Sequence, residues 1–517
     1  MGRKAARAKN WPTVKSCARE ILKQDRRSAD GWFLNGLVAK AGRQYQQAVT
    51  AFSKVLHYDE GRYDAAIELA DLLQPVFRHN EAAALVRKYH PLLENSPYYL
   101  LMAADTCTKL GLHDLAWPLY RRANELQPDV DRIQAGLAAS SVLAGKIDIA
   151  RKLYTGLLRK HPGHQRNHYE LSRLGRAENF DHVNQMKAIL DGNGLPPEKN
   201  IFLYYAIGKE LEDLELWEEA FDYYRLGGNA ASKQSKTAGY SVDSDIKLID
   251  SIVNTCCRDW LESGNPPGRP EKRERRPIFI VGLPRTGTTL TERIVSSHSQ
   301  VESVDETFFL RIAIKLVSGV AGAATMSSRI VEHAARKNSD LIAAKYFDAI
   351  RYRLGDSPFF IDKYPENYLY LGFIARAFPE ARIVHLRRNP MDSCFAMYKQ
   401  SYFRQAYTLD DLGNYYLAYD RLSRHWLDVL GDRLIDIEYE HLVAKPEEQV
   451  RALLGRLGLG FEPACMDFHL NESPSATASA AQVREKVHTR SVNKWKNWEK
   501  QLEPLRQKLE AAGIAVD

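Results

Sequence analysis

The residues best suited to chemistry form the segment GLPRTGTT, at positions 282–289. Its two glycines permit a tight turn, and its last two threonines open a helical pattern whose free N–H groups would face the loop. The apolar, β-branched run at 277–281 directly before it predicts a buried parallel strand. A strand, a glycine-containing loop and a helix in this order predict a site for an anion such as phosphate.

The cation of this loop stands at an unusual place. The spacing of Gly282 and Gly287 matches the phosphate loop of nucleotide hydrolases up to the position that should carry lysine. Here that position is Thr288, and the cation is Arg285 inside the loop. Arg285 could hold a phosphate and a leaving oxygen, whereas a kinase or nucleotidase would need the lysine and an aspartate partner for Mg²⁺. We therefore expect a phosphate-containing ligand, a reaction other than phosphoryl transfer, and no metal.

A second cation ends another predicted strand. The apolar run at 358–362 closes on Asp362, and Lys363 follows it. Open α/β sheets bind ligands beyond the carboxyl ends of their strands, so Lys363 is expected to point into the same crevice as the loop. The alternative is a solvated lysine that pairs with Asp362.

Four apolar runs supply the elements that would position these groups. Each run has the length and composition of a buried strand, and helical patterns separate them. Residues 277–517 are therefore expected to form a three-layer α/β domain with a parallel sheet, similar to P-loop folds. The runs lie at 277–281, 358–362, 382–387 and 433–438.

The N-terminal half repeats every 34 residues. Small alanines recur at this period, and a bulky residue follows each of them four positions later. The period resembles the tetratricopeptide repeat, in which a small alanine lets paired helices approach closely. It implies an α-solenoid over residues 1–230, with an incomplete first unit near 12–27 and a degenerate unit at 165–198. The pairs are Ala48 and Phe52, Ala82 and Val86, Ala116 and Tyr120, and Ala150 and Tyr154.

Residues 231–276 are expected to connect the two domains. Residues 226–242 are small, polar and basic, as in a linker, a helix is expected near 243–262, and a basic hinge broken by Pro and Gly follows it. Repeat arrays often hold peptides on a concave face, but they also form dimer surfaces or plain scaffolds. We expect a peptide or protein partner on the array and leave a homodimer open.

Composition narrows the function classes. The net charge of +7 is too diffuse to indicate a nucleic-acid partner. The sequence contains no apolar run of about 18 residues, which is the length that would predict a membrane span. The N-terminus lacks the apolar stretch of a signal peptide, and the six cysteines are scattered without metal-ligand spacing. These features favour reduced thiols and a cytoplasmic location.

At the loop the chain resembles sulfotransferases, whose loop for the 5′-phosphosulfate reads Pro-(Lys/Arg)-(Ser/Thr)-Gly-Thr-Thr. Over residues 270–517 it is most similar to the tyrosylprotein type, in which a Gly-Glu-Glu-Thr segment follows the loop helix. Residues 304–307 here read Val-Asp-Glu-Thr. The resemblance implies that Glu306 is the catalytic base, with Glu302 and Asp305 as alternatives. A fused repeat array is also typical of many bacterial members. The loop residues implied to bind the nucleotide are Pro284, Arg285, Thr286, Gly287, Thr288 and Thr289.

The resemblance extends to a site for a 3′-phosphate at residues 381–402. Family members bind this phosphate through an Arg at a strand end, here Arg388, and a Ser eight residues later. That position is Ala396 in this chain. Ser393 and Lys399 lie on the same predicted helix, and either could compensate. Ser393 is preferred, because it lies near the helix N-terminus, where a phosphate is favoured.

Two further regions carry residues that the resemblance places near the nucleotide. Tyr439, after the last predicted strand, occupies the position that faces the nucleotide. A C-terminal segment from Ala476 onward is similar to the lid of the family, with Ser479, Lys494 and Arg490 as closing residues. Lys486 and Lys496 compete for this role.

Together these features predict transfer of a sulfuryl group from 3′-phosphoadenosine-5′-phosphosulfate (PAPS) to a hydroxyl, without a metal. Arg285 and Lys363 would stabilise the sulfonate and the leaving phosphate, and Glu306 would accept the proton. A carboxylate base suits a phenol, with a pKa of about 10, so tyrosine in a peptide or protein is the first choice. The alternatives are a carbohydrate, lipid or small-phenol acceptor, and a non-catalytic repeat scaffold with a degenerate nucleotide domain, for which Ala396 argues.

Overall fold

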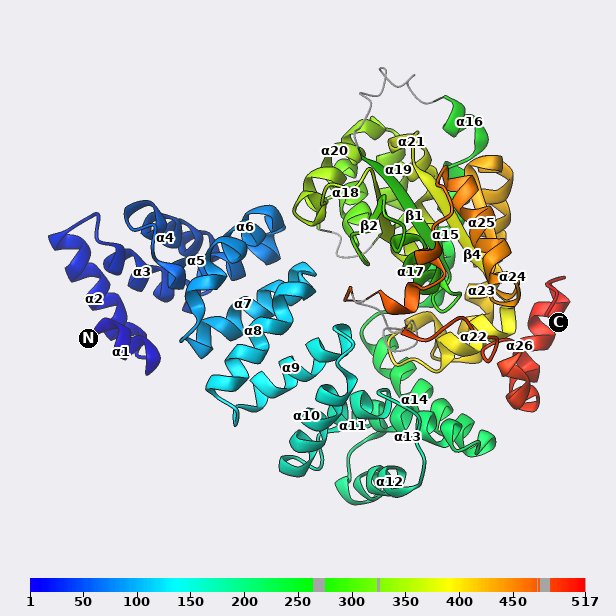
Figure 1. The fold of residues 1–517 in the computed structure, drawn as a ribbon, viewed down its shortest axis with the longest axis horizontal. Helices are drawn as coiled ribbons and strands as arrows, with labels where there is room; N and C mark the ends of the chain where they lie inside the picture. Colours follow the sequence, from blue (N-terminus) through cyan, green and yellow to red (C-terminus); the bar gives the residue numbers. More distant parts are fainter. Residues whose placement is uncertain (264–274, 323–325, 472, 475–483, 517) are drawn as a thin grey trace. The chain divides into compact units, whose positions relative to one another are not determined.

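The structure is a computed structural model that describes residues 1–263, 275–322, 326–471, 473–474 and 484–516 (Figure 1). It divides into two compact units. One comprises Met1–Leu153 and Ala349–Arg353, and the other comprises Tyr154–Asp348 and Leu354–Asp517. The division falls inside the helical array rather than near residues 230 or 276, so the predicted domain limits stay a prediction.

The first unit is an array of helices in which consecutive helices pack as pairs, α3 with α4, α5 with α6, and α7 with α8. The repeat alanines of α4, α6, α8 and α10 are fully buried, as the 34-residue period predicts. In the first of these pairs, Gly36 lets the helices approach closely. A Cβ at this position would lie 2.7 Å from the ring of Phe52. The helices are α1 Gly2–Arg7, α2 Trp11–Gln24, α3 Ala29–Ala41, α4 Tyr45–Tyr58, α5 Tyr63–Leu73, α6 His79–Tyr89, α7 Pro97–Leu110, α8 His113–Leu126, α9 Asp131–Leu143 and α10 Ile147–Lys160, and the division between the units falls within α10.

The second unit begins with the remaining helices of the array. The degenerate repeat predicted at 165–198 is a short helix α11, Gln165–Ser172, followed by α12, Asp181–Asn193. The next pair, α13 (Ile201–Asp213) and α14 (Trp217–Thr237), makes extensive contacts.

The linker predicted at 226–242 is wrong for most of its length, because α14 continues to Thr237. Most small residues in the first part of this segment are buried rather than exposed. Gly227, Gly228, Ala230 and Ala231 lie on the packed side of the helix, and a Cβ on Gly228 would overlap the carbonyl oxygen of Tyr407. Small residues here serve close packing, a use that composition alone does not distinguish from flexibility. The helix expected near 243–262 is present as two, α15 (Val242–Thr255) and α16 (Arg258–Glu262).

The rest of the second unit is built around a parallel sheet in the order β2-β3-β1-β4-β5. All four predicted strands are confirmed: β1 is Arg276–Gly282, β3 Phe359–Lys363, β4 Arg382–Arg387 and β5 Leu434–Glu438. The edge strand β2, Val301–Ser303, was not predicted, because three residues carry too little pattern.

Helices cover both faces of this sheet, as a three-layer fold requires. Ile278 and Ile280 of β1 join a buried core with the apolar sides of α17 and α25. The intervening Phe279 points to the other face, where its ring lies 5.8 Å from that of Tyr346 in α20 and 5.5 Å from that of Phe378. The helices are α17 Thr288–Ser296, α18 Phe309–Ser318, α19 Ser328–Ala335, α20 Ser339–Ile350, α21 Leu371–Ala377, α22 Pro390–Tyr398, α23 Leu409–Leu430, α24 Tyr439–Ala444, α25 Pro446–Leu457 and α26 Glu499–Ala511. No helix of the described residues is long and apolar enough to cross a membrane.

Close packing within the array makes a prediction about Gly208 in α13. A Cβ at this position would lie 2.9 Å from the ring of Tyr224 and 3.2 Å from the carbonyl oxygen of Ala220. Gly208→Ala should therefore lower the free energy of unfolding by about 1–3 kcal/mol through overpacking. Gly156 in α10 is the matched control, because a Cβ added there would have no described heavy atom within 4 Å. Gly156→Ala should raise stability by up to ~1 kcal/mol, and urea unfolding of both variants would contradict the account if the two shifts had the same sign.

Candidate functional site

The loop predicted to bind phosphate lies between β1 and α17, and both of its glycines are required by their surroundings. Gly282 has φ of 151°, and a Cβ there would overlap the carbonyl oxygen of Leu386 in β4. Gly287 has φ of 97°, and its Cβ would lie 2.6 Å from the ring of Tyr439. The loop is therefore packed between the end of β4 and Tyr439, which brings that predicted nucleotide residue to the loop.

The end of α17 that faces the loop is suited to an anion. Gly287 is its N-cap residue and, within the described chain, no side chain caps the helix. Thr286 donates its hydroxyl to the carbonyl oxygen of Leu283 at 2.7 Å, which fixes the turn rather than the helix end. The backbone N–H groups of the first turn thus remain for a ligand, as the strand-loop-helix pattern predicts.

Arg285 takes a left-handed conformation, with φ of 72°, at the centre of this loop. Burial lowers the pKa of its guanidinium, and the neighbouring cations Arg388 and Arg173 act in the same direction, while Tyr402 opposes them. Positive groups gathered in a poorly solvated place repel one another, and a bound anion would relieve this repulsion.

Lys363 ends β3, the strand next to β1, and is fully buried. Its ammonium donates to the carboxylate of Glu306 in a close ion pair and lies 3.6 Å from the carboxylate of Glu292 in α17. Burial alone would lower the pKa of Lys363, but the two carboxylates outweigh it and raise the pKa. The structure thus brings the predicted base and the predicted sulfonate-binding lysine into contact. The Glu306 side chain is 32% exposed, so an acceptor can reach it.

The alternative pairing of Lys363 with Asp362 is wrong. Asp362 is buried and accepts hydrogen bonds from the hydroxyls of Thr307, at 2.9 Å, and Tyr346, at 2.7 Å. The bond to Thr307 fixes the segment that carries Glu306 directly to the neighbouring strand. Asp362 therefore positions the predicted base and leaves the lysine to the two glutamates.

Arg388, at the end of β4, connects three segments. Its guanidinium donates to the carbonyl oxygen of Arg285 in the loop, at 2.9 Å, and to that of Ser491 near the C-terminus, at 2.5 Å. It lies over the ring of Tyr439, 4.9 Å from the ring centroid. Arg388 therefore lies beside the loop, and its role in binding a 3′-phosphate stays a prediction.

The neighbouring Arg387 behaves differently. It forms ion pairs with Asp436 and Glu438 of β5, at 2.5 Å and 3.1 Å. It is engaged with the adjacent strand rather than with the loop, which makes it a natural control for Arg388.

The two residues predicted to compensate for Ala396 lie in different surroundings. Ser393 is buried in the first turn of α22, and its hydroxyl is 3.5 Å from the carbonyl oxygen of Arg388. Lys399 donates to both carboxylate oxygens of Glu212, at 2.8 Å and 2.9 Å. Ser393 is thus beside Arg388, whereas Lys399 is committed to a carboxylate. That Ser393 rather than Lys399 binds a phosphate stays a prediction.

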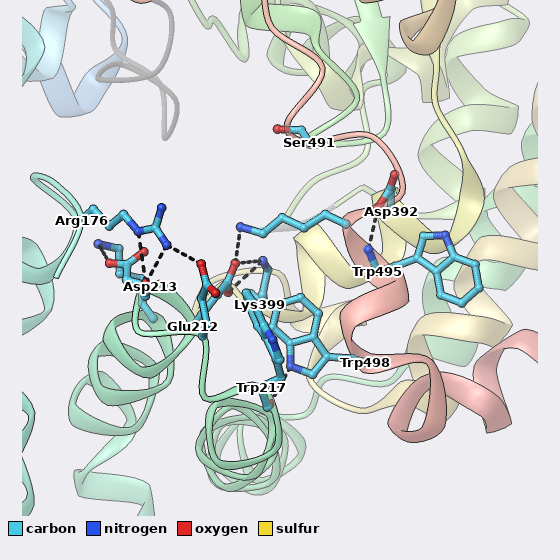
Figure 2. Close-up of polar contacts among 12 residues, drawn as sticks. Arg176, Glu212, Asp213, Trp217, Asp392, Lys399, Ser491, Trp495 and Trp498 are labelled. Carbon is cyan, nitrogen blue, oxygen red and sulfur yellow. Dashed lines mark hydrogen bonds and ion pairs between the residues drawn. The ribbon is translucent and has the colours of Figure 1, made fainter. Parts of the chain in front are cut away.

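The C-terminal segment returns to this region through α22. Asp392 accepts a hydrogen bond from the backbone N–H group of Trp495 at 3.0 Å (Figure 2). It accepts another from the backbone N–H group of Asn493 at 2.7 Å. Arg490 pairs with Glu485 instead of reaching the loop. The predicted nucleotide residue Ser479 lies outside the described residues.

Lys494, the remaining predicted lid residue, donates to Glu212 at 2.7 Å. Glu212 is buried at the end of α13 and also accepts a hydrogen bond from the Tyr224 hydroxyl at 2.8 Å. Burial alone would raise the pKa of Glu212, but Lys399 and Lys494 outweigh it and lower the pKa to about 2. A residue of the helical array is therefore the common partner of two lysines of the α/β domain.

The depressed pKa of Glu212 makes stability depend on pH. Because the folded-state pKa is about 2 and the ordinary value is 4.5, ionised Glu212 stabilises the protein above about pH 4.5, and this contribution is lost as pH falls toward 2. The difference in unfolding free energy between the wild type and Glu212→Gln should shrink by roughly 2 kcal/mol between about pH 5 and pH 3. Urea unfolding at the two pH values measures it. A difference that is constant or grows toward low pH would contradict the ion pairs.

Three site residues escaped sequence reasoning, namely Glu212, Glu292 and Asp392. Asp392 closes the segment Arg-Asn-Pro-Met-Asp at 388–392, directly after the strand that leads to Arg388, so its proximity to the site could have been expected. Glu292 lies in α17 four residues after Thr288, where a carboxylate reads as an ordinary helix surface residue. For Glu212 the local pattern carries no signal, because its partners are distant along the chain.

Comparisons with known proteins assign part of the chain to a family. Residues 277–463 match the family model described as "Sulfotransferase family", so this part of the chain is a sulfotransferase-family domain. A protein of Aquifex aeolicus (strain VF5) named "Uncharacterized protein" is 24% identical over 422 residues, which cover 80% of this chain and 54% of that protein. The chain thus spans about half the length of this relative.

Other similarities are more local. A "Putative protein-tyrosine sulfotransferase" of Caenorhabditis briggsae is 24% identical over 229 residues, 42% of this chain and 80% of that protein. Among solved structures, the sulfotransferase domain of the Synechococcus PCC 7002 olefin synthase is 17% identical, with a TM-score of 0.33, and covers 48% of this chain and 98% of that one. The predicted resemblance to sulfotransferases with an attached repeat array is confirmed, while the likeness to the protein-tyrosine type is distant.

Proposed function

We propose that this protein transfers the sulfuryl group of PAPS to an acceptor hydroxyl, and that the acceptor is tyrosine in a peptide or protein. The observation that carries the proposal is the close ion pair between Glu306 and the buried Lys363. It lies at the end of β3, next to the strand that leads into the loop with Arg285. A carboxylate base and two cations at neighbouring strand ends are what sulfuryl transfer needs.

The residues present fit a nucleotide with phosphates at both ends of its ribose. The N-terminus of α17 suits the 5′ side, because no described side chain caps it. On the 3′ side, the Nε atom of Arg388 is buried and has no hydrogen-bond partner among the described residues. A buried donor without a partner costs free energy, which a phosphate oxygen would recover. Ala396 stands where family members carry the serine that binds the 3′-phosphate. In this proposal Ser393, buried beside Arg388, provides the hydroxyl instead.

Each charged group has a distinct task in this proposal. PAPS supplies the sulfuryl group, and the bond that breaks is the one between sulfur and the bridging oxygen of the 5′-phosphate. Arg285 and Lys363 stabilise the negative charge on the sulfonate and on that oxygen. Glu306 accepts the proton of the acceptor hydroxyl. Glu292 remains paired with Lys363 during this step. Asp362 holds Thr307 and so keeps Glu306 in place.

Tyrosine is the proposed acceptor for two reasons. A phenol with a pKa of about 10 gives its proton to a carboxylate more readily than a sugar alcohol does. Several of the relatives with sequence similarity carry the name protein-tyrosine sulfotransferase. The helical array supports a peptide or protein acceptor, because such arrays commonly present a peptide-binding face.

Nucleotide selectivity tests this proposal. We expect calorimetry to show that 3′-phosphoadenosine-5′-phosphate (PAP) binds at least tenfold more tightly than AMP or ATP, because only PAP engages both Arg388 and the loop. Equal affinities, or no binding of any of the three, would contradict a PAPS site. Binding of PAP without any turnover of PAPS would favour the non-catalytic scaffold.

A further inference from the structure

The last helix pair of the array shares an apolar contact with the sulfotransferase domain inside the second unit. Phe221 of α14 stacks on Tyr398 of α22, with ring centroids 5.7 Å apart. The indole N–H of Trp498 donates to the carbonyl oxygen of Trp217 at 2.7 Å, and the two indoles meet edge to face (Figure 2). This buried contact fixes α14, and with it the paired helix α13, relative to α22, so that a side chain on α13 can act at a defined place on the other domain.

Glu212 is that side chain, and all of its described partners lie close. The carboxylate accepts hydrogen bonds from Lys399 at 2.8 Å and 2.9 Å (Figure 2). It also accepts from Lys494 at 2.7 Å and from the hydroxyl of Tyr224 at 2.8 Å. One negative charge thus meets two positive charges, which leaves the cluster with a net charge of +1 by simple addition. Positive charge in excess at a buried place favours an anion.

The two lysines differ in what they can still bind. The Lys399 side chain is 15% exposed, uses both carboxylate oxygens, and lies over the rings of Phe395 and Trp498, at 4.9 Å and 5.3 Å from their centroids. Lys494 is 41% exposed and makes one contact with Glu212. An ammonium has three donors, so Lys494 keeps N–H groups for a second partner.

The backbone on either side of Lys494 is anchored at the predicted nucleotide site. Arg388 binds the carbonyl oxygen of Ser491, and Asp392 binds the N–H groups of Asn493 and Trp495. The main chain is therefore held by α22 and the end of β4, and Glu212 fixes the side chain of Lys494.

We propose that Glu212 is a positioning residue of the nucleotide site, which holds the ammonium of Lys494 where its remaining N–H groups bind a phosphate of the nucleotide. This inference rests on the proposed function. Its consequence is that nucleotide affinity depends on a residue of the helical array, outside residues 277–463 that match the family. The array then contributes to donor binding and not only to acceptor binding.

A double-mutant cycle tests this role with PAP as the probe. Calorimetry compares the wild type, Glu212→Gln, Lys494→Met and the double variant, all as full chains. We expect each single variant to weaken PAP binding about tenfold, the effect of one lost charge-assisted hydrogen bond. The double variant should be no weaker than Lys494→Met within about twofold, because Glu212 acts through Lys494.

The matched control is Asp213→Asn, at the next position of the same helix. Asp213 accepts hydrogen bonds from Lys209, at 2.6 Å, and from the N–H of Ala177, at 2.9 Å, and so serves the array itself. This variant should leave the PAP affinity unchanged. Glu212→Asp keeps the charge and shortens the side chain. It serves in the cycle if Glu212→Gln melts below the assay temperature, because loss of Glu212 leaves Lys399 buried without its carboxylate.

The outcomes separate the inference from the proposed function. If the wild type does not prefer PAP to AMP, the proposed function fails, and the inference fails with it. If the wild type prefers PAP but the Glu212 variants bind it as tightly as the wild type, the inference alone is overturned. The inference would also be overturned if the losses of PAP affinity in the two single variants multiplied in the double variant. Glu212 and Lys494 would then act independently.

Discussion

Glu306→Gln should reduce kcat about 10²–10⁴-fold, the usual contribution of a general base, while the affinity for PAP stays within about twofold of the wild type. Glutamine has the shape of glutamate but cannot accept the proton of the acceptor. Its amide oxygen can still accept the hydrogen bond from Lys363, and the Glu292 side chain remains as a partner of that lysine. The fold should therefore survive. Single-turnover release of PAP, measured beside calorimetry with PAP, separates the chemical step from binding.

Glu302→Gln is the matched control for this experiment. Glu302 accepts a hydrogen bond from the N–H of Gly355 at 2.8 Å and is engaged away from Lys363. The Glu302→Gln variant should keep near-normal turnover. If Glu306→Gln turned over normally while Glu302→Gln or Asp305→Asn lost activity, one of these neighbours would be the base and the role of Glu306 would be wrong.

Arg388→Ala should weaken PAP binding roughly 30-fold or more, because truncation of a buried charged hydrogen-bonding partner costs at least ~2 kcal/mol. AMP lacks the 3′-phosphate, so its affinity should change far less, and the preference for PAP over AMP should disappear. Arg388→Lys should recover only part of the loss, since an ammonium does not reproduce the fork of a guanidinium. Calorimetry with both nucleotides measures these effects.

Arg387→Ala controls for the loss of an arginine at the same strand end. Arg387 is paired with Asp436 and Glu438 of β5, so its removal should affect stability but not the ratio of PAP to AMP affinity. A folded Arg388→Ala variant that kept the wild-type ratio would show that the 3′-phosphate is not recognised there. Equal loss of PAP and AMP binding would instead point to a structural role, through the carbonyl oxygens of Arg285 and Ser491.

Much of the α/β domain could be predicted because its signals are short-range. A buried parallel strand is a continuous apolar run, and the polar residue that ends it falls at the ligand-binding edge of the sheet. This logic places Lys363 at the end of β3 and Arg388 directly after β4. The tight turn at the loop glycines could also be predicted, because Gly282 and Gly287 both have a positive φ.

The elements that sequence reasoning missed depend on tertiary contacts. Residues 226–237 have the composition of a linker, yet they form the end of α14, because small residues let this helix approach the chain at Tyr407. Glu212 gives no local signal either, since Lys399 lies 187 residues and Lys494 lies 282 residues further along the chain. Such partners are set by how the pair α13 and α14 packs against α22. One sequence does not encode that packing in any local pattern.

The most direct test of the account is sulfuryl transfer itself. The full chain is incubated with PAPS and, in separate reactions, a tyrosine-containing peptide, a small phenol and a saccharide, and the products are identified by mass spectrometry together with released PAP. We predict sulfated tyrosine in the peptide, formed in step with PAP, and no product with the same peptide carrying Phe in place of Tyr. Sulfation of the saccharide alone would move the acceptor to another class. PAP binding with no sulfated product from any acceptor would contradict the central claim that this protein is a sulfotransferase.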